Sequence, residues 1–122
     1  MTPTDFARHV TAFLTTYLAG QRNASPNTIH SYRDTFVLLL RYFRDVRNLP
    51  VERITMATLD APAIVAFLEY LQTERRCSPR TCNQRLAVIH AFARYVQGEA
   101  PDHLLAMQRV LATPPRRFAR KP

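Results

Sequence analysis

Glycine is scarce in this sequence: two glycines occur among 122 residues. All-β proteins of this size need many glycine turns, so the scarcity favours helices joined by short connections that proline and serine mark. No apolar run approaches the roughly 18 residues that span a bilayer, and the N-terminus lacks the charged-then-apolar order of a signal peptide. We therefore expect a cytoplasmic all-α protein, and the length suits one domain.

Cysteine and histidine are too sparse to predict a disulfide framework or a metal site. Cys77 and Cys82 lie five residues apart, which does not match the spacing of structural zinc ligands. The four histidines form no metal-like cluster along the chain; they are His9, His30, His90 and His103. We expect free thiols, no metal and no cofactor.

Lysine is nearly absent, because Lys121 is the single example, yet the chain is strongly basic. Seventeen Lys and Arg residues against nine Asp and Glu residues give a net charge of +8 and an isoelectric point near 10.5. Such a balance indicates a polyanionic partner, although composition alone does not separate DNA from RNA or an anionic membrane. Arginine offers a planar fork that suits phosphate and guanine, which favours a nucleic acid.

Apolar periodicity predicts a compact bundle of four to five helices over residues 1–112. The helices are expected at about 4–18, 26–45, 61–76, 79–97 and 102–111, with Gly20 and Gly98 as helix stops. Ser25, Asp60 and Ser78 each precede a helix that opens with proline, which is a helix-start signal. Residues 113–122 contain three prolines and several basic residues, and we expect them to form an exposed basic linker. The predicted core comprises Phe6, Val10, Phe13, Leu14, Tyr17, Ile29, Tyr32, Phe36, Leu39, Leu40, Phe43, Ile64, Phe67, Leu68, Leu71, Cys82, Leu86, Ile89, Phe92, Ala93, Val96, Leu104, Met107 and Leu111.

Two predicted helices carry basic faces away from their apolar stripes. On the second helix the basic face comprises His30, Arg33, Arg41, Arg44 and Asn48. On the fourth, a face with steps of three and four residues comprises Arg80, Asn83, Ala87, His90 and Arg94. No acidic residue occurs between Glu74 and Glu99, so the fourth helix is strongly positive along its length. The pattern alone also fits the solvated charged face of a helical bundle.

The order and spacing of four stretches resemble a known family. They are Ser25-Pro26-Asn27-Thr28-Ile29-His30-Ser31-Tyr32-Arg33-Asp34, Ala66-Phe67-Leu68-Glu69-Tyr70-Leu71, Ser78-Pro79-Arg80-Thr81-Cys82-Asn83-Gln84-Arg85-Leu86 and Phe92-Ala93-Arg94-Tyr95. Together they resemble the N-terminal core-binding (SAM-like) domain of phage-integrase-type tyrosine recombinases, the Xer-like group in particular. The resemblance covers nearly the whole chain.

This resemblance implies a helical domain that forms half of a clamp on double-stranded DNA, with its second and fourth helices in the major groove. It implies DNA contacts by Thr28, Arg33, Arg80, Thr81, Asn83 and Arg85, and the basic faces add His30, Arg41, Arg44, His90 and Arg94 as candidates. Arg85 lies at the edge of the apolar stripe, so it either contacts DNA or supports the bundle. Gln84, Ala87 and His90 depart from the Arg, Ser and Arg that Xer-like members often carry, and His90 can still donate to a phosphate.

Catalysis in that family uses a tyrosine nucleophile with Arg, Lys and His residues in a separate C-terminal domain. The five tyrosines of this chain lie at or beside predicted core positions, so we expect no nucleophile and no enzymatic activity of the chain alone. The resemblance implies a linked catalytic domain and other recombinase protomers, with a tetramer in the synaptic complex, and no membrane partner. Two alternatives remain: a helical protein-interaction module, and a stand-alone accessory DNA-binding protein from a truncated recombinase gene.

Overall fold

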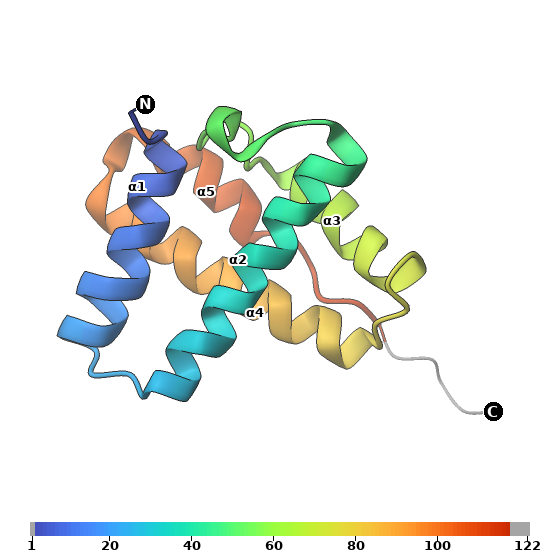
Figure 1. Cartoon of the computed structure of the whole chain (residues 1–122), viewed down its shortest axis with the longest axis horizontal. Helices are drawn as coiled ribbons and strands as arrows, with labels where there is room; N and C mark the ends of the chain where they lie inside the picture. Colours follow the sequence, from blue (N-terminus) through green and yellow to red (C-terminus); the bar gives the residue numbers. More distant parts are fainter. Residues whose placement is uncertain (1, 118–122) are drawn as a thin grey trace.

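The computed structural model describes residues 2–117, and every regular element among these residues is a helix (Figure 1). The elements are α1 (Asp5–Ala12), the π-helix η1 (Phe13–Gln21), α2 (Pro26–Arg47), the 3-10 helix η2 (Val51–Arg53), α3 (Ala61–Thr73), α4 (Pro79–Glu99), the 3-10 helix η3 (Pro101–His103) and α5 (Leu104–Leu111). No strand occurs among these residues. The predicted all-α bundle is confirmed.

Three helices begin where the cap-then-proline signals predict. The Ser25 Oγ accepts a hydrogen bond from the Thr28 amide (3.2 Å), and the Ser78 Oγ accepts one from the Thr81 amide (3.1 Å). The Asp60 carboxylate accepts from the Ala63 amide (2.9 Å) at the start of α3. Each side chain satisfies an amide of the first turn that has no partner within the helix, which fixes the start of the helix at that residue.

The predicted helix stops at Gly20 and Gly98 are wrong, because both glycines lie inside helices. The left-handed conformation occurs instead at Asn23 (φ 48°), Asn48 (φ 54°) and Arg76 (φ 54°). After each of these residues, the next amide donates to a carbonyl six residues back: Ala24 to Leu18, Leu49 to Phe43 and Cys77 to Leu71. Asparagine tolerates the left-handed region well, so two of the three stops follow from residue type.

The first helix continues from Phe13 as nine residues of π-helix and ends at Gln21, three residues past its predicted end at about Leu18. The Thr15 hydroxyl donates to the Thr11 carbonyl (2.7 Å), a side-chain bond that competes with the regular backbone pattern where the π-helix begins. Bonds from residue i to i+5 widen the turn, and Phe13 and Leu18, five residues apart, are both buried. The wide turn therefore lets two large side chains enter one core.

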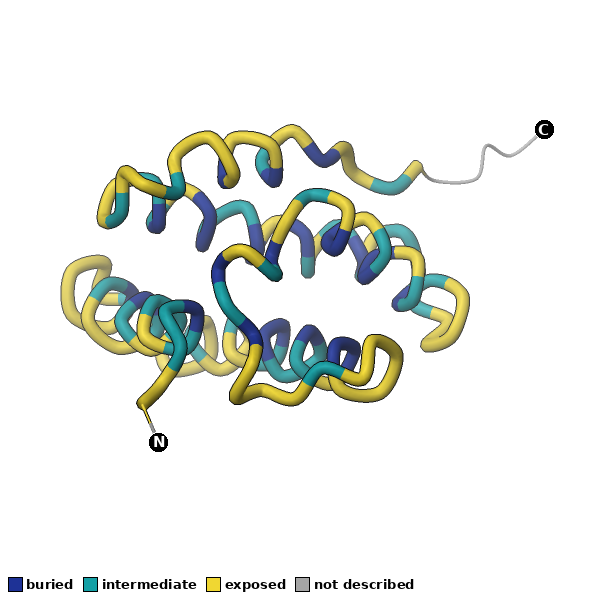
Figure 2. Tube along the Cα trace, turned by 90° about the horizontal axis from the view of Figure 1, so that it is seen from above, coloured by how far each residue is buried: buried dark blue, intermediate teal, exposed yellow. Residues whose placement is uncertain are grey.

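Helix α4 is the centre of the bundle, and α2, α3 and α5 all contact it. Figure 2 shows α5 on one side of the molecule and α1 on the other, with buried positions turned inward. The centroid of the Phe92 ring on α4 lies 5.9 Å from that of Phe6, 5.5 Å from that of Phe13 and 5.2 Å from that of Phe36, so one aromatic cluster joins α4 to α1, η1 and α2. These edge-to-face contacts stabilise the core beyond the burial of apolar area.

The predicted core is largely confirmed, with one error on α5. Every core residue predicted on α3 and α4 is buried. Leu104, predicted to be buried, is 55% exposed, and Val110 fills the core in its place beside Met107. The sequence pattern also missed three buried residues in the connection between α2 and α3, which are Ile54, Met56 and Leu59. A segment without helical periodicity gives no signal for such anchors.

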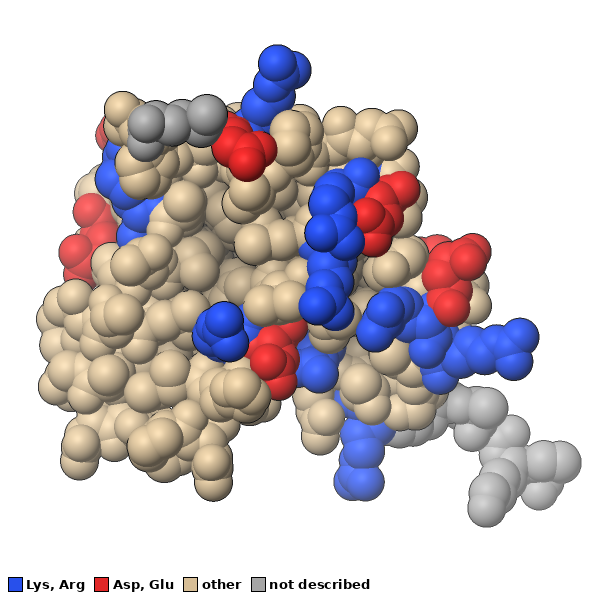
Figure 3. All heavy atoms as spheres, in the orientation of Figure 1, with Lys and Arg blue, Asp and Glu red and all other residues tan. Residues whose placement is uncertain are grey.

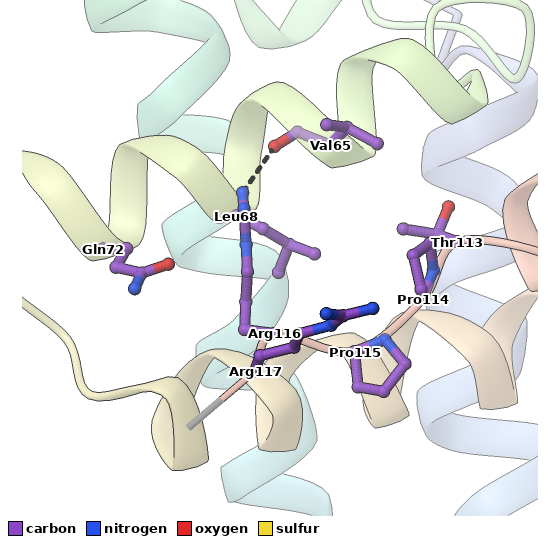
Figure 4. Close-up of a pocket in the computed structure, with 8 residues that line it drawn as sticks. All are labelled: Val65, Leu68, Gln72, Thr113, Pro114, Pro115, Arg116 and Arg117. Carbon is purple, nitrogen blue, oxygen red and sulfur yellow. Dashed lines mark hydrogen bonds between the residues drawn. The ribbon is translucent and has the colours of Figure 1, made fainter. Parts of the chain in front are cut away.

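Residues 113–117, called here the C-terminal strap, lie across α3 and α4, with Thr113 buried, Arg116 half-buried, and Pro114, Pro115 and Arg117 exposed. The Asn83 side chain holds the strap with two hydrogen bonds, accepting from the Arg116 amide (2.6 Å) and donating to the Arg116 carbonyl (3.0 Å). The Arg116 guanidinium donates to the Val65 carbonyl (3.3 Å), as Figure 4 shows, and lies 3.2 Å from the Glu69 carboxylate. Residues 118–122 of the predicted linker lie outside the described residues.

Candidate nucleic-acid interface

One side of α4 faces solvent along the length of the helix. This side, called here the α4 stripe, comprises Arg80, Gln84, Ala87, Ala91 and Arg94, at alternating steps of four and three residues. All are exposed except Ala91, which is half-buried. The small alanines at its centre allow a partner to approach the helix closely, and arginine and glutamine at its ends are hydrogen-bonding groups suited to phosphates and base edges.

The α4 stripe differs from the predicted face by one position at two places. Asn83 and His90, predicted to lie beside Arg80 and Arg94, are half-buried on the side of α4 that α5 and the C-terminal strap cover. Gln84 and Ala91 take their places on the open side. Both sets have helical spacing, so only the position of α5 and the strap distinguishes them.

The surroundings of His90 disfavour its charged form. Burial lowers the pKa of His90 below its usual 6.5 more than the nearby Val110 backbone raises it, and the charge on Arg94 lowers it further. The His90 Nε2 is buried without a hydrogen-bond partner among the described residues. An uncharged and covered imidazole is a poor phosphate ligand, so the prediction of a DNA contact by His90 gains no support from its position.

Arg85 connects the two helices that carry the basic faces. Its Nη1 donates to the Thr35 hydroxyl (3.2 Å) and approaches the Ser31 carbonyl (3.5 Å), both on α2. Thr35 is fully buried. Of the two roles considered for Arg85, its contacts correspond to support of the bundle, since this side chain fixes how α2 crosses α4.

The outer face of α2 is mixed in charge. His30, Arg33, Arg41 and Arg44 are all exposed there, as predicted. However, the Arg44 Nε lies 2.7 Å from the Asp45 carboxylate, which raises the pKa of Arg44 and lowers that of Asp45, and the His30 Nε2 lies 3.8 Å from Asp34. In Figure 3, red carboxylates lie among the blue side chains on the face that α2 crosses. This face is therefore less positive than its arginines alone suggest.

Thr28 and Thr81 occupy equivalent places in the first turns of α2 and α4. Each hydroxyl pairs with its cap serine, at 3.0 Å for Ser25 and Thr28 and 3.2 Å for Ser78 and Thr81. Thr28 is exposed and Thr81 half-exposed. A hydroxyl both donates and accepts, so each threonine can bond to its serine and to a partner at once.

A groove of about 330 Å³ lies between α2 and the start of α4. Its lining includes Arg41 from α2, Arg75 before α4, and Thr81 and Arg85 from α4, together with the carboxylate of Asp34. Sequence reasoning missed Arg75 here and Gln84 on the α4 stripe. The helical spacing of Gln84 from Arg80 was a usable signal, whereas Arg75 lies in a connection where spacing has no meaning.

Within residues 2–117, no three His, Cys, Asp or Glu side chains are grouped so that they could hold a metal ion. Cys77 and Cys82 are free thiols, and burial raises the pKa of the Cys82 thiol. Over the same residues, every helix is too short or too polar to cross a bilayer.

Comparison with known proteins identifies the family. Residues 10–100 match the profile of "Phage integrase, N-terminal SAM-like domain". Two proteins of Sinorhizobium fredii, each named "Putative integrase/recombinase", are similar: y4rC is 46% identical over 109 residues, and y4rD is 35% identical over 100 residues.

These matches cover 89% and 82% of this chain but 33% and 36% of the two relatives, so the chain spans about a third of their length. No solved structure gives a comparably significant match. The match of the family profile over most of the helical bundle agrees with the resemblance carried by the Ser-Pro helix starts. The chain belongs to the family of phage integrase N-terminal SAM-like domains.

Proposed function

We propose that this chain is the DNA-binding domain of a site-specific tyrosine recombinase and that it grips duplex DNA through α2 and α4. One observation carries the proposal: the α4 stripe is exposed except at the half-buried Ala91, and no acidic residue occurs between Glu74 and Glu99. Such a surface attracts phosphates without an internal competitor for its arginines. Family membership supplies the recombinase context.

The geometry of the α4 stripe suits the major groove. From Arg80 to Arg94 it extends over 15 residues, a rise of about 21 Å along the helix. The major groove of B-DNA is about 12 Å wide and admits a helix. The alanines at the centre of the stripe would then lie deepest, while Arg80 and Arg94 reach the sugar-phosphate backbones at the two sides of the groove.

Catalysis, in this proposal, belongs to a covalently linked C-terminal domain that these 122 residues do not include. The length of the relatives supports the idea, since about two thirds of each lies outside the matched region. The domain would position that catalytic domain on the DNA for integration or recombination. We further propose that protomers assemble on DNA, as a tetramer in the synaptic complex, and that the protein acts in the cytoplasm.

An anisotropy titration of the chain with duplex DNA tests the proposal. We expect binding at about 50 mM salt that weakens steeply by about 200 mM, because each arginine that neutralises a phosphate releases counterions. A suicide substrate should trap no covalent adduct with any tyrosine of this chain. Absence of binding at low salt, or affinity that salt leaves unchanged, would contradict the proposal.

A protein-interaction module is the second candidate, and one observation favours it. Leu104 and Leu105 at the start of α5 are 55% and 65% exposed, which is unusual for adjacent leucines on a helix. The titration separates the candidates, because a protein-interaction module with solvated basic faces would show no affinity for duplex DNA at low salt.

A further inference from the structure

A cavity of about 360 Å³ lies at the far end of the α4 stripe, where η1, the start of α2 and the second half of α4 meet. Its wall is aromatic and its rim is basic. It is lined by Phe13, Tyr17, Leu18, Arg22, Ala24, Thr28, Tyr32, Ala91 and Arg94. Ala91 and Arg94 also belong to the α4 stripe, so the cavity continues the surface proposed to meet DNA.

The two arginines of this cavity come from different parts of the chain. Arg22 follows the π-helix and Arg94 lies on α4, 72 residues later. No carboxylate of the described residues lies within 4.0 Å of either guanidinium, and none lines the cavity. Both guanidiniums line a cavity that no carboxylate lines, so an anion bound there would meet positive charge from two parts of the chain.

Tyr17 holds Arg22 in place. The Arg22 Nη1 donates to the Tyr17 hydroxyl (3.3 Å), and the guanidinium carbon lies 5.9 Å from the centre of the Tyr17 ring. The ring in turn packs against Phe13 (5.8 Å between centroids) and Tyr95 (4.9 Å). One of the five N–H donors of Arg22 is used in this contact, so the others remain for a ligand. An arginine held this way loses little side-chain entropy on binding.

We propose that Arg22 and Arg94 form a clamp for one backbone phosphate of duplex DNA, with Thr28 as an additional hydroxyl donor. This inference rests on the proposed function and extends its interface from α2 and α4 to the segment after the π-helix. The position of Arg94 supports it, since this arginine belongs both to the cavity and to the end of the α4 stripe. The first turn of α2 adds the positive end of a helix dipole.

The test compares Arg22→Gln with Arg109→Gln in the full chain. Both variants lose one exposed positive charge, but Arg109 lies on α5, which packs against a different side of α4 from α2. For Arg22→Gln we expect the slope of log affinity against log salt to fall by about one, with equal loss for DNA of any sequence. Arg109→Gln should keep the wild-type slope. Phosphate ethylation interference should show one phosphate that matters for the wild type and not for Arg22→Gln.

Arg22→Lys is a second variant that preserves the charge and removes the planar fork. It should keep the salt slope and lose part of the affinity, while thermal melts of all variants check that the bundle is intact. If the wild type binds DNA and Arg22→Gln matches Arg109→Gln in slope and interference pattern, the clamp is wrong and the proposed function stands. If the wild type binds no DNA, both the proposed function and the clamp are wrong.

Discussion

Helices α2 and α4 begin alike and differ in what surrounds them. Both open with Ser-Pro-x-Thr, and their cap bonds agree within about 0.1 to 0.2 Å in length. On α2 the exposed face includes carboxylates that pair with its own basic groups, through Asp34 and Asp45. On α4 the exposed stripe has no acidic member, and three other helices cover the rest of the helix.

The difference shows that a shared start signal fixes where a helix begins but not what the helix does. Charge that pairs within a helix face is partly neutralised before any partner arrives, whereas unpaired charge is available to a polyanion. We therefore expect α4 to contribute more to both stability and DNA affinity than α2, and four experiments test this expectation.

Truncation of a core side chain should give the largest difference in stability between substitutions on α4 and on α2. Phe92→Ala on α4 removes a fully buried ring that contacts three other phenylalanines, and we expect a loss of about 3–5 kcal/mol in the free energy of unfolding. Leu40→Ala on α2, where the side chain is only half-buried, should cost clearly less. Urea denaturation measures both, and equal losses would contradict the central place of α4.

Removal of charge from the exposed faces should affect DNA affinity and not stability. Arg80→Ala and Arg94→Ala together should weaken binding about equally for DNA of any sequence, because each removes a contact to a backbone phosphate, with little change in melting temperature. The matched α2 pair, Arg33→Ala with Arg44→Ala, removes the same charge from the mixed face and should weaken binding less. Anisotropy titrations at one salt concentration show which pair loses more DNA affinity, and a larger loss from the α2 pair would contradict our expectation that α4 contributes more.

Asn83 should act on stability rather than on binding. Asn83→Ala removes two hydrogen bonds to the Arg116 backbone, and we expect a loss of roughly 1–3 kcal/mol in unfolding free energy. His30→Ala, at the equivalent exposed position of α2, should leave stability nearly unchanged. Hydrogen exchange at the Arg116 amide should accelerate in Asn83→Ala alone. If Asn83→Ala instead weakens DNA binding as much as Arg80→Ala, Asn83 reads DNA as the sequence predicted.

His90 gives the smallest effect, a dependence of stability on pH. Because its folded pKa lies below 6.5, the unfolded chain binds the proton more readily, so this residue's contribution is intact above about pH 6.5 and is lost as the pH falls toward the folded pKa. His90→Gln should be less sensitive to acid than the wild type over that range. Melting temperature is measured against pH from 7.5 to 5.5 for both proteins, and the difference between them isolates the effect of His90 from that of the carboxylates. Parallel curves would show that burial does not lower the pKa of His90.

Much of the fold follows from local sequence, and the site does so only in part. Cap serines before Pro26 and Pro79 predicted two helix starts to the residue, because a cap bond is a local interaction. The stops at Gly20 and Gly98 were wrong, since glycine permits a left-handed turn without requiring one. Helical spacing predicted that one side of α4 faces solvent but not which residues lie on that side, because Asn83 and Gln84 both fit the repeat.

Tertiary packing determines which side of α4 faces solvent. Val110 of α5 covers His90, and Arg116 of the strap covers Asn83. Arg22 could not be found by periodicity either, because its partner Arg94 is 72 residues away and the cavity between them forms only when η1 packs beside α4. Long-range contacts of this kind have no signature within a single helix.

The C-terminal strap determines where the described part of the chain ends. Val110 of α5 lies beside His90 and Arg116 of the strap lies beside Asn83, so this part of the chain runs antiparallel to α4 and the described residues end near the second turn of α4. The catalytic domain proposed above would be tethered to the bundle through the Arg116 anchor, which lies on the helix that carries the α4 stripe. A short tether from such an anchor gives that domain a high effective concentration at the DNA that the stripe holds, without a single direct contact between them.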